Sequence, residues 1–377
     1  MAEIHGVCDE RFAQVSETLA ASLDAGQDVG ASVAVYVDGQ LAVDIWGGYA
    51  DEATKRPWEA DTITNVWSTT KTMTALSALI LADRGEIDLH APVARYWPEF
   101  KANGKEHVEV RHLMGHTAGL SGWTEPMTIE DLYDWEKATS LLAAQEPWWE
   151  PGTASGYHAV TQGYLVGEVV RRVSGQSLGQ FFASELAGPL GADFHIGLPA
   201  DQHHRVSNVI PPPPIEMAGL APDSIAVRTF SNPPLSAEAS WTAPWREAEI
   251  PAANGHGNAR SVGRVQSVLS CGGEVDGHRF LSEKGCDAVF EVQANGTDMC
   301  LAVPLTLGNG YGINSPELPI SPNTRACFWG GWGGSIVVND LDARMTVAYM
   351  MNRMDAGLVG DMRGFGIVMA AFEGVQG

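Results

Sequence analysis

The sequence predicts an α/β fold of the α+β type: an antiparallel sheet flanked by helices, built from both ends of the chain, with a mainly helical region inserted. Two observations lead to this prediction. β-rich runs occur at residues 32–46 and return at residues 336–350. From about residue 86 to residue 190 the pattern is mainly helical, with loops. Because strands at both ends need layers to cover them, the simplest assembly is one sheet shared by the two termini.

This arrangement divides the 377 residues into two predicted domains. The sheet domain comprises residues 1–80 and 255–377, and the mainly helical domain comprises residues 81–254. Within the second domain, residues 208–254 carry a polyproline run (Pro211 to Pro214) and further scattered prolines. We therefore expect a long irregular excursion there, over the surface or over a cleft.

Local patterns predict the hairpins of the sheet and the helix before them. Apolar residues recur every three or four positions from Phe12 to Leu23, which predicts an amphipathic helix. Residues 32–37 and 40–46 are joined by Asp-Gly, a pair that favours a tight turn because glycine tolerates a positive φ. Residues 336–339 and 345–350 predict a second hairpin near the C-terminus.

Three longer helices are expected outside the hairpins. Residues 68–84 have apolar side chains around much of the helix circumference and are followed by Gly85, so this helix should be buried in a core. Residues 160–174 form a helix that ends at Gly175. Residues 358–372 form a closing helix.

The composition excludes several classes of partner. Asp and Glu number 46 against 23 Lys and Arg, which gives a formal charge of −23. Nucleic acids and anionic membranes both need a cationic face, so we expect neither as a partner. The sequence starts without a basic, apolar leader and has no apolar run of the roughly 20 residues that cross a bilayer. We therefore expect a cytoplasmic protein, and the sequence indicates no particular oligomeric state.

Neither a metal nor a cofactor is expected. The five cysteines are scattered without a C-x-x-C pair, and the eleven histidines show no metal-ligand spacing. No phosphate-binding P-loop motif is present.

One Ser-x-x-Lys motif, Ser68 to Lys71, opens the buried-looking helix. Residues three apart share a helix face, so the Lys71 amine is within reach of the Ser68 hydroxyl. The positive end of the helix favours an alkoxide, and burial lowers the pKa of a lysine. This pattern predicts an activated nucleophile beside its base. Taken alone, the motif more often means a serine that caps a helix and a lysine in solvent.

Two further segments are candidates for the same site. Tyr157 stands just before the helix at residues 160–174, where a tyrosine near a Ser/Lys pair relays protons, although most tyrosines at such junctions only pack. Residues 329–334 contain four glycines directly before a strand, which indicates a backbone that another group approaches closely. Such a strand edge could donate a second N–H to an oxyanion, the first coming from Ser68. A tight, aromatic-lined bend is the alternative.

A competing nucleophile is Ser177, in Gly-Gln-Ser-Leu-Gly. This segment matches the Gly-x-Ser-x-Gly elbow of α/β-hydrolases, which needs a strand before the serine. The preceding residues 160–174 predict a helix instead, and Gly175 has the character of a helix stop. We therefore expect Ser177 to be a structural residue.

The order of these motifs resembles that of the serine β-lactamase and penicillin-binding superfamily. More narrowly, the chain is similar to the family VIII carboxylesterases, which are related to class C β-lactamases. The likeness covers roughly residues 10–375 and implies a serine β-lactamase-like fold. Supporting stretches are residues 66–71, 88–93, 111–120 and 254–260.

The resemblance implies a role for each candidate. Ser68 would be the nucleophile, with Lys71 and Tyr157 sharing the base and acid roles. The third family motif, usually Lys-Thr-Gly in β-lactamases, falls on Trp329-Gly330-Gly331, and the oxyanion donors would be the N–H groups of Ser68 and Trp332. The residues expected to bind the oxyanion or the substrate are Trp332, Trp329, Gly330, Gly331 and His158.

Two departures from β-lactamases point to the substrate. The Tyr-x-Asn motif of those enzymes is Tyr157-His158-Ala159 here, and Lys-Thr-Gly has become Trp-Gly-Gly, so a cation that would hold a carboxylate is missing. The sequence therefore predicts a serine carboxylesterase for uncharged, short-chain, small-molecule esters. The alternatives are a β-lactamase or D-Ala-D-Ala carboxypeptidase, an amidase or acyltransferase, and a non-catalytic sensor that is acylated and stalls.

Overall fold

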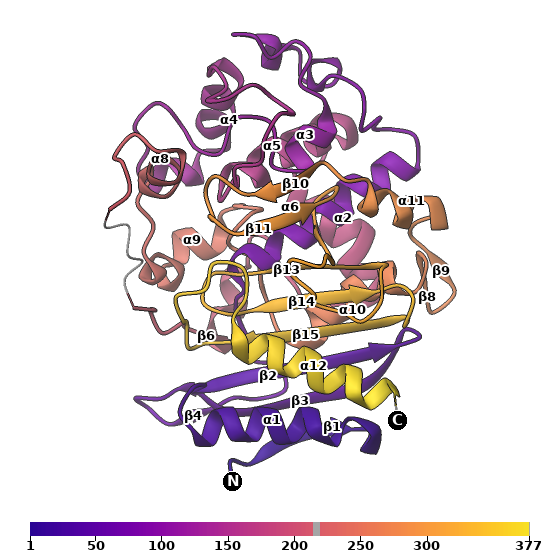
Figure 1. Cartoon of the computed structure of the whole chain (residues 1–377). Coiled ribbons are helices and arrows are strands. Elements are labelled where there is room, and N and C mark those ends of the chain that lie inside the picture. The colour runs from indigo at the N-terminus through magenta and orange to yellow at the C-terminus, as the bar shows by residue number, and fades with distance from the viewer. Residues whose placement is uncertain (214–218, 377) are drawn as a thin grey trace.

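The computed structural model describes residues 1–213 and 219–376, and its largest element is an antiparallel sheet (Figure 1). The strands pair in the order β1-β3-β2-β15-β14-β13-β12-β11-β10, with β4 paired to β3. The strands are β1 (Ile4–Cys8), β2 (Gly30–Val37), β3 (Gln40–Asp51), β4 (Arg56–Pro57), β10 (Ala294–Thr297), β11 (Pro304–Leu307), β12 (Gly312–Ile313), β13 (Ala326–Gly330), β14 (Ile336–Asp340) and β15 (Met345–Met351).

The two ends of the chain meet inside this sheet, where β2 pairs with β15 and Val35 lies opposite Val347. This confirms the predicted sheet from both termini, and with it the predicted fold class. Both predicted hairpins are present as β2–β3 and β14–β15. At the first turn, Asp38 and Gly39 have φ of 50° and 75°, the positive values that a tight two-residue hairpin turn requires.

Helices cover both faces of the sheet. In Figure 1, α12 (Met362–Gln376) crosses in front of the strands and α10 (Ala259–Ser270) lies behind them. α12 packs on α1 (Ala13–Asp24), so the first and last helices share one face. The other helices are α2 (Thr70–Asp83), α3 (Val110–Met114), α4 (Trp135–Ala144), α5 (Thr161–Ser174), α6 (Leu178–Phe182), α7 (Gly188–Leu190), α8 (Ile225–Ser231), α9 (Ala243–Glu247) and α11 (Glu283–Asp287).

Small strand pairs complete the described part of the chain. β5 (Ile63–Asn65) pairs with both β6 (Val206–Ser207) and β7 (His256–Gly257). β8 (Glu274–Val275) pairs with β9 (His278–Arg279). The β5–β6–β7 group joins segments assigned from the sequence to different domains, and the division after residues 80 and 254 stays a prediction.

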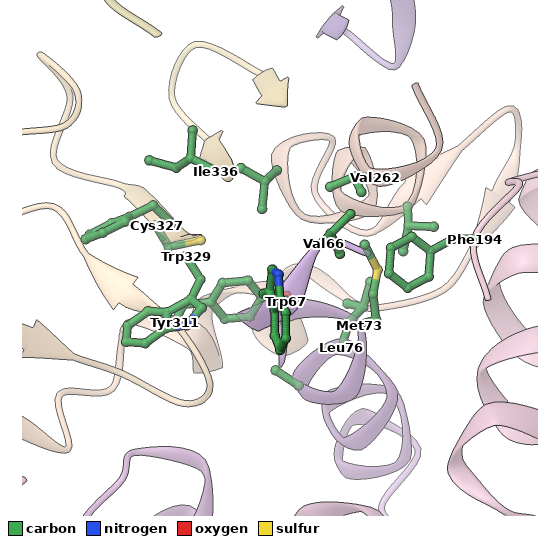
Figure 2. Packing of buried hydrophobic residues seen from close by; sticks show 14 of the residues in the cluster. Val66, Trp67, Met73, Leu76, Phe194, Val262, Tyr311, Cys327, Trp329 and Ile336 are labelled. Carbon is green, nitrogen blue, oxygen red and sulfur yellow. The ribbon is translucent and has the colours of Figure 1, made fainter. Parts of the chain in front are cut away.

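The helix α2 is buried on all sides, as its sequence predicts. Every residue from Thr70 to Leu81 is buried, and a 3₁₀ turn, Trp67–Thr69, leads into the helix. Figure 2 shows the packed side chains around this entry, Val66, Trp67 and Met73 among them. Any polar group on the first turn of α2 is therefore held away from water.

The other predicted helices have mixed outcomes. α5 ends at Gly175, whose φ of 74° confirms the predicted stop, and Ser177 then caps α6 and lies 2.6 Å from Glu249 Oε1. The element directly before Ser177 is the helix α5 and not a strand, so the hydrolase elbow is excluded. The irregular excursion over 208–254 is wrong in part, because its described residues include α8 and α9. Pro214, in the polyproline run, lies outside the described residues.

No helix among the described residues is long and apolar enough to cross a membrane. Nor do three or more His, Cys, Asp or Glu side chains gather anywhere in residues 1–213 and 219–376 in a way that would hold a metal ion.

Candidate active site

Ser68 lies in the turn that begins α2, and the backbone around it is tightly held. The residue before it, Trp67, has a φ of 47°, a conformation that non-glycine residues rarely adopt and that is concentrated at functional sites. The Trp67 indole packs against Trp245 and Trp332, with ring centroids 5.5 and 4.9 Å away. Val66 N–H donates to Gly255 O over 2.9 Å. The turn is therefore fixed by its surroundings rather than by its own conformational preference.

The Lys71 amine is the centre of the site. Its Nζ lies 3.1 Å from Ser68 Oγ and 2.9 Å from the Tyr157 hydroxyl. The same nitrogen donates to the carbonyl oxygens of Ala159, over 2.6 Å, and Ala252, over 3.0 Å. The structure thus brings together the three residues that the sequence motifs had singled out as catalytic candidates.

These contacts fit a neutral lysine. Carbonyl oxygens only accept hydrogen bonds, so Ala159 and Ala252 take both hydrogens of an uncharged amine and leave its one lone pair for a hydroxyl. Lys71 is 1% exposed, and this burial lowers its pKa well below the ordinary value. Burial therefore favours the uncharged form of the amine, whose lone pair would lie on the side of Ser68 and Tyr157.

Tyr157 completes a ring of short contacts. Its hydroxyl donates to Ser68 Oγ over 2.6 Å, while burial raises its pKa above the ordinary value and keeps the phenol protonated. The Tyr157 ring packs between His116 and Trp329, with centroids 5.1 and 5.5 Å away. The backbone N–H of Tyr157 donates to Asp298 Oδ1 over 3.1 Å. A phenol, an alcohol and an amine thus lie within hydrogen-bond distance of one another, so a proton can pass among them.

His158 differs from its expected place in the substrate site. Its ring is completely buried, Nδ1 lies 2.6 Å from Gly156 O, and Nε2 accepts from Leu120 N–H over 3.2 Å. Both ring nitrogens are therefore occupied by the backbone, and neither is left for substrate. His158 instead supports the loop that carries Tyr157.

The segment Gly331–Ser335, which we call the glycine loop, lies against the turn of Ser68. A methyl group on Gly331 would lie 2.4 Å from Val66 O and 3.3 Å from Ser68 N, so only glycine permits this approach. Within the described residues, no backbone or side-chain acceptor takes the N–H of Trp332, the next residue. The close approach expected of Gly330 and Gly331 is present, because a methyl on Gly330 would meet Gly360 N at 2.4 Å.

A small cavity opens beside Ser68. Its volume is about 80 Å³, and none of its lining residues carries a charge. Ser121 and Thr229 add hydroxyls to the wall, joined by a contact of 2.7 Å. A larger cavity of about 1330 Å³ lies between α1 and α12, and Ser68 does not line it. The apolar part of the small cavity wall includes Trp67, Trp123, Phe230, Leu235, Trp332 and Leu358.

Trp329 is buried and forms a wall behind Tyr157 rather than a lining residue of the cavity. Three supporting residues were not anticipated from the sequence. Asp298 Oδ1 accepts from three backbone N–H groups, that of Tyr157 included, and His116 Nδ1 accepts from His158 N–H over 3.0 Å. Ser335 donates to Val66 O over 3.0 Å. Of these, Ser335 had a sequence signal in its place beside the glycines, and His116 lies in the stretch 111–120 that supports the resemblance.

A Ser-x-x-Lys motif at the start of a buried helix, behind a sheet built from both termini, defines the serine β-lactamase class of proteins. The chain belongs to the beta-lactamase family, whose family model matches residues 15–365.

Several known proteins are similar to this chain. The Esterase/beta-lactamase LipL of Mycobacterium tuberculosis is 39% identical over 370 residues, which cover 94% of this chain and 84% of LipL. A crystal structure of a family VIII carboxylesterase superposes with a TM-score of 0.93 and 42% identity, covering 99% of this chain and 100% of the other. A penicillin-binding protein homologue from Caulobacter crescentus also has a TM-score of 0.93, with 35% identity and the same coverage. The predicted resemblance is confirmed.

The buried histidines predict a loss of stability in weak acid. Burial lowers the pKa of His158 and of His256 to about 3. Below pH 6.5 the unfolded chain therefore binds protons that the folded chain does not, so stability falls as the pH falls. Between pH 7 and pH 5 we expect a loss on the order of 2 kcal/mol for each histidine. Urea unfolding at the two pH values measures it, and His158→Gln should reduce the difference. Equal stability at both values would contradict the assignment.

Proposed function

We propose that the protein is a serine carboxylesterase that cleaves short-chain esters through a covalent acyl-enzyme on Ser68. One observation carries this proposal: the buried amine of Lys71, whose pKa burial lowers, lies 3.1 Å from the Ser68 hydroxyl oxygen. The similarity to proteins named an esterase/beta-lactamase and a family VIII carboxylesterase supports ester hydrolysis. The cytoplasmic location expected from the sequence stays a prediction.

In the acylation half-reaction, Ser68 Oγ attacks the ester carbonyl carbon and its proton moves to Lys71 Nζ. The oxyanion that forms accepts hydrogen bonds from the N–H groups of Ser68 and Trp332, aided by the positive end of α2. Tyr157 then gives its proton to the leaving alkoxide and takes one from Lys71, over contacts of 2.9 Å or less to its neighbours. The alcohol leaves, and the amine is neutral again.

Deacylation runs the same relay in the opposite direction. Tyr157 and Lys71 take a proton from water as it attacks the acyl carbon, and Lys71 returns a proton to Ser68 Oγ when the tetrahedral intermediate collapses. Because burial lowers the pKa of the Lys71 amine and raises that of the Tyr157 phenol, we assign Lys71 as the primary base and Tyr157 as the relay.

Uncharged esters are the substrate class that this cavity favours. The lining residues of the 80 Å³ cavity carry no charge, so a carboxylate placed there would lose hydration without gaining a charged partner among them. The aromatic walls suit an acyl or alcohol group of a few carbons. Trp329 stands where β-lactamases usually have the lysine of Lys-Thr-Gly, which supports the same preference.

Ser68→Ala should abolish hydrolysis of p-nitrophenyl butyrate, because the variant has no nucleophile, and should leave the fold intact. Ser177→Ala is the control, since it removes a helix cap at a cost of about 1 kcal/mol but should keep full turnover. Steady-state rates and circular dichroism of both variants measure this. Most of the activity surviving in Ser68→Ala would refute the assignment.

Tyr157→Phe should lower kcat by on the order of 10²-fold, because it removes the proton relay while the ring still packs. Tyr164→Phe is a matched control: this tyrosine is equally buried, and its hydroxyl donates to Leu132 O. It should lose stability without losing turnover. An unchanged kcat in Tyr157→Phe would reduce Tyr157 to a wall residue.

Wild-type protein should hydrolyse p-nitrophenyl acetate and butyrate with kcat/KM at least roughly tenfold above that for the octanoate, because the cavity accepts few carbons. Nitrocefin, which carries a carboxylate, should be a poor substrate. A chain-length series run beside nitrocefin measures both preferences. Faster turnover of nitrocefin than of every ester would favour the β-lactamase alternative, and product partition to added amines would favour an acyltransferase.

A further inference from the structure

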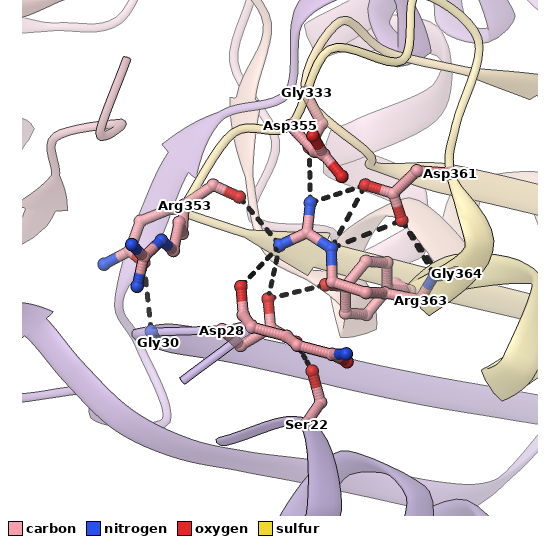
Figure 3. A network of polar contacts seen from close by, with 12 residues as sticks. Ser22, Asp28, Gly30, Gly333, Arg353, Asp355, Asp361, Arg363 and Gly364 are labelled. Atoms are coloured by element: carbon pink, nitrogen blue, oxygen red, sulfur yellow. Dashed lines mark hydrogen bonds and ion pairs between the residues drawn. The ribbon is translucent and has the colours of Figure 1, made fainter. Parts of the chain in front are cut away.

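The glycine loop is held from two sides by side chains that the mechanism above does not use. One is Arg363, at the start of α12. Its Nη2 donates to Gly333 O over 2.7 Å, and its other N–H groups go to Asp28, Asp361 and backbone carbonyls (Figure 3). The Arg363 side chain is 9% exposed, so this guanidinium is fixed by partners on every side.

The ion pair of Arg363 and Asp361 touches the backbone of the loop directly. A methyl group on Gly334, whose φ is 127°, would lie 2.2 Å from Asp361 Oδ2 and 2.6 Å from Arg363 Nη2. The absence of a side chain at this position therefore allows the pair to reach the loop. Because the guanidinium is rigid and fully bonded, the position of Gly333 follows the position of the ion pair.

Ser335 holds the opposite side of the loop against the turn of Ser68. Its Oγ donates to Val66 O over 3.0 Å and lies 3.0 Å from Thr69 Oγ1. Ser335 and Thr69 are 2% and 0% exposed, so water does not compete for these bonds. Val66 and Thr69 flank Ser68 within one turn. A single hydroxyl thus links the loop that carries Trp332 N–H to the turn that carries Ser68 N–H.

We propose that Arg363 and Ser335 are positioning residues for ester hydrolysis, which hold Trp332 N–H at the oxyanion from opposite sides of the glycine loop. The inference rests on the proposed function. A donor that meets negative charge only in the transition state contributes to kcat and little to substrate binding. Moving it should therefore lower kcat and leave KM nearly unchanged.

The experiment compares Ser335→Ala and Arg363→Gln with two matched controls. Ser270→Ala removes a buried hydroxyl that also contacts one threonine hydroxyl, Thr346, and one backbone carbonyl, but on α10. Arg205→Gln breaks the ion pair of Arg205 with Asp193, in which the arginine side chain is 12% exposed. Rates are divided by the active sites titrated with a fluorophosphonate, so that loss of folded protein does not count. The affinity for an alkyl trifluoromethyl ketone, which forms an oxyanion on the serine, is measured in parallel.

Per titrated site, we expect kcat of Ser335→Ala and Arg363→Gln to fall by on the order of 10²-fold, with KM within about twofold. Affinity for the ketone should fall by a similar factor, and both controls should keep the wild-type kcat. If Arg363→Gln yields no folded protein, Ser335→Ala decides alone.

An unchanged kcat per site in Ser335→Ala, or an equal loss in Ser270→Ala, would overturn the inference. A wild-type protein that does not turn over esters overturns the proposed function and this inference together. A wild-type protein that does, beside an unaffected Ser335→Ala, overturns only the inference.

Discussion

The site depends on one constraint: among the residues that the structure describes, no carboxylate pairs with the buried amine of Lys71. Lys71 is 1% exposed, and two carbonyl oxygens, rather than a carboxylate, receive its hydrogens. A carboxylate in their place would stabilise the ammonium and remove the base. The segment that carries the Ala252 carbonyl packs closely on α5, because a methyl on Gly163 of α5 would lie 2.4 Å from Ala252 N. The chemistry of α2 is thus set by what packs around it.

The same constraint ties the fold to the site. Ser68 comes from the 3₁₀ turn before α2 and Lys71 from α2, while Tyr157 comes from the loop before α5 and Trp332 from the loop between β13 and β14. No single segment contains the arrangement, and each is anchored by residues far away in the sequence. Asp298 fixes the backbone of Tyr157, and Arg363 fixes the glycine loop. The contacts that hold these segments in the fold therefore also set the geometry of the site.

The sequence predicts those features that arise from local rules. The Asp-Gly hairpin, the buried α2 and the stop of α5 at Gly175 need only neighbours in the chain. Strands such as β12, two residues long, exist only because strands on both sides pair with them. No alternation of apolar and polar residues in the sequence predicts them. His158 was expected at the substrate because of its motif, but its orientation is set by Leu120, 38 residues away. Long-range partners of this kind leave no local pattern.

The uncharged lining of the cavity and the lowered pKa of Lys71 are electrostatically linked. An anionic substrate bound beside Lys71 would favour its ammonium form, because an opposite charge raises the pKa of an amine in a medium that screens poorly. A carboxylate in the cavity would then weaken the base. β-Lactamases usually place a second lysine, in Lys-Thr-Gly, next to such a carboxylate. Here Trp329 occupies that motif, and no lining residue of the cavity is charged. In the proposed mechanism, a preference for uncharged substrates therefore also favours the neutral form of the amine, the form that takes the proton of Ser68.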